Sequence, residues 1–177
     1  RDDLAALAAA PQRPPLLLVP KVESAAELTP AQALGIPLVP LVETPKGIRL
    51  AHEIAAAPGV VAMMFGGGDL SAELGVALAW EPLLPARGLF ILACAEAGVP
   101  AIDVPWLALD DEAGLIDETR RAKALGFAAK AAIHPRQVAP IHGVMRPTAD
   151  EIAEAEAAES TFVAAGGAAV RFNGRML

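Results

Sequence analysis

The sequence contains few aromatic side chains and a single thiol. Of 177 residues, 4% are aromatic, none is Tyr, and the one Cys stands at position 94. One Cys excludes a disulfide within the chain and fits a reducing compartment. Because Cys94 lies in the apolar run Leu89–Ala95, we expect a core residue rather than a nucleophile.

Basic residues and long apolar runs are also scarce. The 14 Lys and Arg are outnumbered by 21 Asp and Glu, which gives a net charge of −7. Without a basic run or stripe, a nucleic-acid partner is not expected. No uncharged stretch reaches the ~18 residues of a membrane helix, and no signal segment opens the sequence. We therefore expect a soluble, cytoplasmic protein without a membrane partner.

Hydrophobic residues make up 54% of the chain, and they alternate between short apolar runs and helix-forming stretches. This alternation predicts βαβ units around a parallel sheet, the α/β class. The predicted strands are Leu16–Val22, Ile36–Glu43, Val60–Gly67, Ala101–Trp106 and Ala128–His134. The predicted helices are Ser24–Leu34, Thr44–Ala57, Asp69–Gly75, Leu83–Gly98, Asp110–Gly126, Pro135–Met145 and Pro147–Ala165, while Arg1–Pro11 is typical of a helix end and Val170–Leu177 has no periodicity.

Two acidic residues, Glu43 and Asp69, follow consecutive predicted strands. In α/β folds and (β/α)₈ barrels, ligands bind at the carboxyl ends of the strands. Two carboxylates brought together there, with no Cys or His pair nearby, suit a hard cation such as Mg²⁺. The alternative is that each carboxylate caps the following helix. The glycines at 66–68 favour a ligand site, because they leave the backbone accessible.

Further ionisable residues end the other strands, and each has a structural alternative. Lys130 lies inside an apolar strand, where an unpaired ammonium is costly. We expect it to point into the barrel and meet either a carboxylate or an anionic ligand. Lys21 could pair with Glu23, Asp103 could cap a turn, and His134 could cap the helix that begins at Pro135.

Several motifs occur in an order that resembles a known family. They are LVPKVES (18–24), LVETPKG (41–47), FGGGDL (65–70), AID (101–103), GFAAKAAIHPRQ (126–137), the segment from Pro147 to Ile152, and FNGRM (172–176). In this order they resemble the citrate lyase β-subunit-like acyl-CoA lyases of the HpcH/HpaI aldolase superfamily. The resemblance covers nearly the whole chain from about Leu16.

The resemblance implies a (β/α)₈ barrel that cleaves a 3-hydroxyacyl-CoA thioester of the citryl-, malyl- or citramalyl-CoA type into an acyl-CoA and a 2-oxo acid. It implies Mg²⁺, with Mn²⁺ as the alternative, and a homo-oligomer, a trimer or hexamer. By motif position, the metal ligands are Glu43 and Asp69; the catalytic candidates are Glu43, Lys21 and Asp103; the substrate-binding candidates are Glu43, Gly67, Gly68, Lys130 and His134.

The five predicted strands correspond to strands 4–8 of such a barrel. We expect a partial barrel over residues 1–146 and the start of a C-terminal helical extension over 147–177. The family's first three strands, with a substrate-binding Arg, and a terminal acid/base Asp have no counterpart, so the chain is expected to be a part of a longer protein. The alternatives are a metal-dependent aldolase acting on free 2-oxo acids and a noncatalytic CoA- or oxo-acid-binding paralogue.

Overall fold

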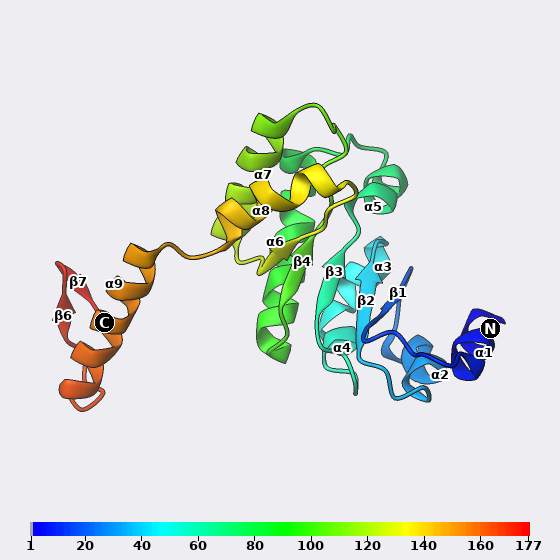
Figure 1. Cartoon of the computed structure of the whole chain (residues 1–177), viewed down its shortest axis with the longest axis horizontal. Coiled ribbons are helices and arrows are strands. Elements are labelled where there is room, and N and C mark those ends of the chain that lie inside the picture. The colour runs from blue at the N-terminus through cyan, green and yellow to red at the C-terminus, as the bar shows by residue number, and fades with distance from the viewer. Residues whose placement is uncertain (1) are drawn as a thin grey trace. The chain divides into compact units, whose positions relative to one another are not determined.

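A computed structural model describes residues 2–177; Arg1 lies outside them. Its centre is a sheet of five parallel strands in the order β1-β2-β3-β4-β5 (Figure 1). The strands are β1 (Leu17–Val19), β2 (Leu38–Val42), β3 (Met63–Phe65), β4 (Ala101–Asp103) and β5 (Ala129–Lys130). Each lies within a predicted apolar run, so the α/β class and the parallel sheet are confirmed.

Helices connect the strands close to the predicted positions. They are α1 (Asp2–Ala9), η1 (Ala25–Leu28), α2 (Thr29–Gln32), α3 (Pro45–Arg49), α4 (Ala51–Ala55), α5 (Gly67–Leu74), α6 (Trp80–Ala97), α7 (Glu112–Leu125), η2 (Pro135–Gln137), α8 (Val138–Met145) and α9 (Ala149–Ala164). Two predictions were wrong in detail. The stretch expected as one helix to Ala57 is interrupted at Leu50, whose ψ of 13° is not helical. Helix α6 begins at Trp80, before Leu83; Pro82 is accommodated in its first turn, where N–H groups have no helical acceptor.

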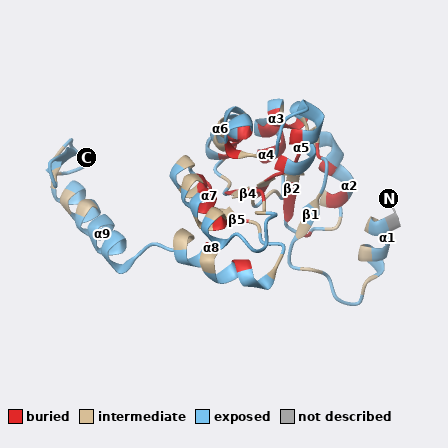
Figure 2. Cartoon of the chain, turned by 90° about the horizontal axis from the view of Figure 1, so that it is seen from above, coloured by how far each residue is buried: buried red, intermediate tan, exposed pale blue. Residues whose placement is uncertain are grey.

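The two faces of the sheet have different surroundings. Leu38, Val42, Met63, Phe65 and Ala101 belong to the hydrophobic core formed with the helices. In Figure 2 the buried residues gather where β2 and β4 face helices α3 to α7. The strand residues that alternate with these core residues point to the opposite face of the sheet, because side chains alternate along a strand. They form the register Leu41–Met64–Ile102–Ala129 and are only half-buried.

Three phenylalanines fill the space between the strands and the long helices. The ring centroids of Phe65 and Phe90 are 5.6 Å apart, and Phe127 lies 6.4 Å and 6.2 Å from them. Such contacts stabilise beyond simple burial. Cys94 of α6 is also buried, as predicted for a core residue, and burial raises the pKa of its thiol to about 12. The thiol is therefore protonated at neutral pH.

The chain divides into two compact units, the larger ending at Met145 and the smaller spanning Arg146–Leu177. In the smaller unit, α9 begins with a capping box formed by Thr148 and Glu151 and has no buried residue. The stretch without periodicity forms a hairpin of β6 (Arg171–Phe172) and β7 (Arg175–Met176). Among the described residues, no helix has the length and apolarity needed to cross a membrane.

Candidate functional site

Glu43 and Asp69, which we call the carboxylate pair, lie at the carboxyl ends of neighbouring strands. Glu43 directly follows β2, and Asp69 lies in the first turn of α5, which begins two residues after β3. Neither is a helix cap: Thr44 caps α3 through its hydroxyl, which accepts from the Gly47 amide at 3.0 Å, and α5 begins after Gly66. The capping alternative is therefore wrong for both carboxylates.

Lys21 contacts both members of the carboxylate pair. Its backbone amide donates to Oε1 of Glu43 at 3.0 Å, and its Nζ lies 2.8 Å from Oδ2 of Asp69. Its φ of 52° falls in the left-handed region, which costs a non-glycine residue about 1 kcal/mol or more. Lys21 does not pair with Glu23, whose carboxylate instead binds Lys46 at 3.1 Å.

The electrostatics of the carboxylate pair favour a positive charge between its members. The hydrogen bond and charge of Asp69 raise the pKa of the Lys21 ammonium. Burial raises the pKa of Glu43, the charge of Asp69 raises it further, and the amide of Lys21 opposes both effects. Two carboxylates that share one exposed ammonium remain under-neutralised, and a cation would relieve this.

The glycines before Asp69 let the backbone approach the carboxylate pair. A Cβ at Gly66 would lie 2.3 Å from Cβ of Glu43 and 3.0 Å from Cδ1 of Leu41, so Glu43 lies over the half-buried face of the sheet. A Cβ at Gly67 would meet packed side chains at 3.2–3.3 Å, whereas one at Gly68 would meet nothing within 4 Å. The first-turn amides of α5 lack helical acceptors and are directed toward the same edge.

A second ionic group, which we call the buried network, consists of Arg87, Asp103, Glu118 and Lys130. Lys130 Nζ lies 2.8 Å from Oδ2 of Asp103 and 2.7 Å from Oε1 of Glu118. Arg87 Nε lies 2.9 Å from Oδ1 of Asp103. The side chains of Arg87, Asp103 and Lys130 are at most 1% exposed. The expectation that Lys130 meets a carboxylate is confirmed.

The direction predicted for Lys130 was wrong. Asp103 and Lys130 are paired in register and share the face of Ala101, which packs against the helices. Lys130 therefore points toward Glu118 of α7 and away from the other face of the sheet. Asp103 does not cap a turn, because its carboxylate is occupied by the two basic side chains. The catalytic role of Asp103 and the substrate-binding role of Lys130 stay predictions.

His134 follows β5 and begins η2. Its Nδ1 accepts from the Arg136 amide at 3.1 Å, so the capping alternative describes its contact in the structure. Its substrate-binding role stays a prediction.

Arg87 and Glu118 were missed by sequence reasoning. The signal for Arg87 was a single charge within the apolar stretch Leu83–Ala95, where a buried charge requires a partner.

Comparisons with known proteins agree with this architecture. The HpcH/HpaI aldolase/citrate lyase family matches residues 1–135. A (3S)-malyl-CoA thioesterase of Cereibacter sphaeroides is 36% identical over 156 residues, covering 86% of this chain and 54% of that protein. The mitochondrial citramalyl-CoA lyase of Homo sapiens is 31% identical over 178 residues, covering 88% and 52%. The chain thus spans about half the length of these curated relatives.

Among solved structures, the chain is similar to CitE from Mycobacterium tuberculosis in complex with magnesium, acetoacetate and coenzyme A. The TM-score is 0.77 at 33% identity, and the match covers 99% of this chain and 67% of CitE. The family match, the order of the motifs and the parallel sheet all indicate the same family. The chain belongs to the HpcH/HpaI aldolase/citrate lyase family.

Proposed function

We propose that the chain is part of a Mg²⁺-dependent carbon–carbon lyase that cleaves a 3-hydroxyacyl-CoA thioester into an acyl-CoA and a 2-oxo acid. The observation that carries the proposal is the carboxylate pair, held at one edge of the sheet and contacted by Lys21. The relatives named for malyl-CoA and citramalyl-CoA, and the magnesium and coenzyme A bound to CitE, support it.

The donor atoms of the carboxylate pair fit Mg²⁺. Both residues offer hard oxygen ligands, and Mg²⁺ is commonly held by one or two carboxylates while water and substrate fill its other positions. Among the residues described, no group of three or more His, Cys, Asp or Glu could hold a metal, and Glu43 and Asp69 are the two ligands that we propose from this chain. When bound, the ion would supply a Lewis acid for the substrate's carboxylate and neighbouring oxygen.

The chain's own residues would bind and orient the acidic end of the substrate. The amides of Gly67 and Gly68, at the positive end of α5, would donate to a carboxylate. The exposed ammonium of Lys21 would help to neutralise it. Strands 1–3 of the barrel, the choice of acyl-CoA, homo-oligomeric assembly and a cytoplasmic location stay predictions from the sequence.

Metal binding tests the carboxylate pair directly. We expect Glu43→Gln and Asp69→Asn each to weaken Mg²⁺ binding by at least about tenfold, because each removes a charged ligand. Titration calorimetry, or Mn²⁺ electron paramagnetic resonance, measures this without turnover. Glu53→Gln is the control, since it removes an exposed acidic charge from α4, which holds neither carboxylate. Unchanged Mg²⁺ affinity in both site variants would contradict the metal assignment.

Product analysis tests the reaction. Malyl-, citramalyl- and citryl-CoA are incubated with the protein, with and without Mg²⁺, and the products are separated. A carbon–carbon lyase releases an acyl-CoA together with a 2-oxo acid, whereas a thioesterase releases free CoA and an intact hydroxy acid. Free CoA alone would replace the lyase proposal with thioester hydrolysis, and CoA binding without turnover would favour the noncatalytic alternative. Aldol cleavage only of free hydroxy acids would favour the aldolase.

A further inference from the structure

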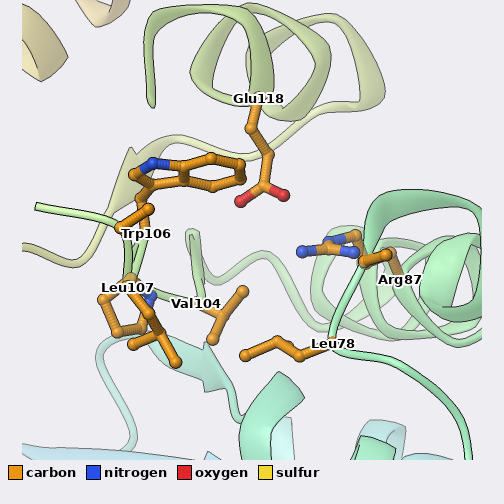
Figure 3. A pocket seen from close by; sticks show the side chains of 9 residues that line it. Leu78, Arg87, Val104, Trp106, Leu107 and Glu118 are labelled. Atoms are coloured by element: carbon orange, nitrogen blue, oxygen red, sulfur yellow. The ribbon is translucent and has the colours of Figure 1, made fainter. Parts of the chain in front are cut away.

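A cavity of about 230 Å³ lies beside the buried network, between α6, α7 and the loop after β4 (Figure 3). The charged side chains in its wall already have partners. Glu118 accepts from Lys130 at 2.7 Å, and the guanidinium of Arg87 lies over the ring of Trp80, 4.6 Å from its centroid. These contacts hold the two helices against the sheet, so the cavity by itself indicates no ligand.

The segment after β1, in contrast, keeps a strained conformation beside the carboxylate pair. Lys21 has a φ of 52°, and a non-glycine residue holds such a conformation where the surrounding structure enforces it. In this conformation its backbone amide donates to Oε1 of Glu43 at 3.0 Å. The contacts that enforce the left-handed backbone therefore also place one of the two proposed metal ligands.

Two neighbouring elements fix the residue that follows Lys21. The amide of Val22 donates to the carbonyl of Leu41 in β2 at 3.2 Å, which ties the segment to the sheet. The carbonyl of Val22 lies against the first turn of α3, where a Cβ at Gly47 would be 2.7 Å from the carbonyl oxygen. This is closer than a Cβ approaches a backbone oxygen, so the contact depends on the missing side chain at Gly47.

Helix α3 is anchored on both sides of this contact. Ile48 belongs to the hydrophobic core, and Nζ of Lys46 lies 3.1 Å from Oε2 of Glu23. The helix therefore cannot readily withdraw from the segment after β1. Gly47 is buried in α3 and is not among the glycines with positive φ, so space, rather than backbone conformation, distinguishes glycine from alanine at this position.

We propose that Gly47 is a positioning residue for Glu43. By admitting the Val22 carbonyl against α3, it holds Lys21 in the left-handed conformation that directs the Lys21 amide onto the Glu43 carboxylate. In Gly47→Ala the methyl group displaces Val22, Lys21 relaxes toward an ordinary φ, and Glu43 loses the hydrogen bond that orients it. The effect on metal binding rests on the proposed role of Glu43 as a Mg²⁺ ligand.

The amide resonance of Lys21 tests this mechanism without metal. An amide that donates to a carboxylate resonates downfield, and Glu43→Gln gives the value expected when that hydrogen bond weakens. In Gly47→Ala the Lys21 resonance should move toward this value, and its hydrogen exchange should quicken by at least about tenfold. Gly88→Ala is the matched control, since a Cβ there, in helix α6, meets nothing within 4 Å. A Lys21 resonance that is unchanged in Gly47→Ala would overturn the proposal.

Mg²⁺ binding tests the consequence for the site. Gly47→Ala should weaken Mg²⁺ binding by roughly tenfold, as the loss of a group that orients a metal ligand commonly does, whereas Gly88→Ala should not. Titration calorimetry measures the affinities, and circular dichroism confirms that both variants are folded. A Mg²⁺ affinity that falls equally in the two variants would contradict a specific role for Gly47.

A double variant separates positioning from general destabilisation. Glycine takes a positive φ without strain, so in a chain that carries Lys21→Gly the backbone amide can stay on Glu43 when its neighbours shift. The further loss of Mg²⁺ affinity caused by Gly47→Ala should then fall below about threefold. A loss of the same size in both backgrounds would show that Gly47 does not act through Lys21.

The two readouts also distinguish this role of Gly47 from the metal assignment. If Glu43→Gln left Mg²⁺ affinity unchanged while the Lys21 resonance moved in Gly47→Ala, the metal assignment would fail and the positioning of Glu43 would stand. If Glu43→Gln abolished Mg²⁺ binding while Gly47→Ala altered neither readout, the metal assignment would stand and the role of Gly47 would fail.

Discussion

Two groups of ionisable side chains lie near the carboxyl ends of the strands: the carboxylate pair after β2 and β3, and the buried network around β4 and β5. The carboxylate pair has Lys21 beside it, and the buried network contains two basic residues. Asp69 and Lys21 are 51% and 67% exposed, whereas Glu43 is buried, and one ammonium faces the two acids. In the buried network, two basic and two acidic side chains neutralise one another away from solvent.

The difference shows that an ionisable residue at a strand end does not by itself indicate a ligand site. The direction of the side chain decides its role. Glu43 lies over the half-buried face of the sheet, where a single ammonium faces two carboxylates. Asp103 lies on the face covered by α6 and α7, where Arg87 of α6 and Lys130 of β5 bind it and Glu118 of α7 binds Lys130. The carboxylate pair is suited to exchanging cations, and the buried network is suited to holding the helices in place.

The largest predicted effect concerns the buried network. Lys130→Met should lower the free energy of unfolding by about 3–5 kcal/mol, because it leaves two buried carboxylates with only Arg87 to compensate them. Urea unfolding followed by circular dichroism measures the loss. The control is Lys46→Met, which removes an exposed ammonium that is paired with Glu23. If Lys130→Met lowered the free energy of unfolding no more than this control does, the buried network would not differ from an exposed ion pair in its contribution to stability.

A smaller effect is predicted beside the carboxylate pair. Gly66→Ala places a methyl group 2.3 Å from Cβ of Glu43, so it should cost about 1–3 kcal/mol of stability through overpacking. It should also weaken Mg²⁺ binding by displacing the Glu43 carboxylate. Gly68→Ala is the matched control, since a Cβ there meets nothing within 4 Å. Equal Mg²⁺ affinities in the two variants would show that Gly66 does not shape the site.

The smallest predicted effect distinguishes electrostatics from packing. Lys21→Met should leave the unfolding midpoint unchanged, because exposed ion pairs contribute little to stability. Mg²⁺ binding should tighten by about threefold to tenfold, because the ammonium no longer competes for Asp69. Titration calorimetry at low and high salt measures this, and screening should reduce the difference. Weaker Mg²⁺ binding would mean that Lys21 organises the carboxylate pair rather than competing at it.

The parallel sheet and the carboxylate pair could be predicted from the sequence. Glu43 and Asp69 follow consecutive apolar runs, and parallel strand ends meet at one edge, so their proximity needed no long-range information. Arg87 and Glu118 could not be assigned to a common site in this way. Their contact with Asp103 or Lys130 depends on which faces of α6 and α7 pack against the sheet, and the few polar residues of α6 give little indication of its buried side.

The hairpin near the C-terminal end was missed for a different reason. Its strands are two residues long, so alternation cannot be recognised. A local signal was nevertheless present in Asn173-Gly174, both of which adopt positive φ, 47° and 79°, as a two-residue hairpin turn requires. The orientation of Lys130 was also unpredictable from its own strand, because β5 is only two residues long and the partner residues lie on other elements.

The direct passage from β3 into α5 affects how stiff the candidate metal site is. Because α5 begins two residues after Phe65, Asp69 is joined to the sheet by a short backbone segment and moves with the helix. The Lys21 side chain, in contrast, is long and exposed. The candidate metal site therefore combines a carboxylate that is held by a helix with a flexible lysine side chain. On cation binding, most of the movement would be that of Lys21.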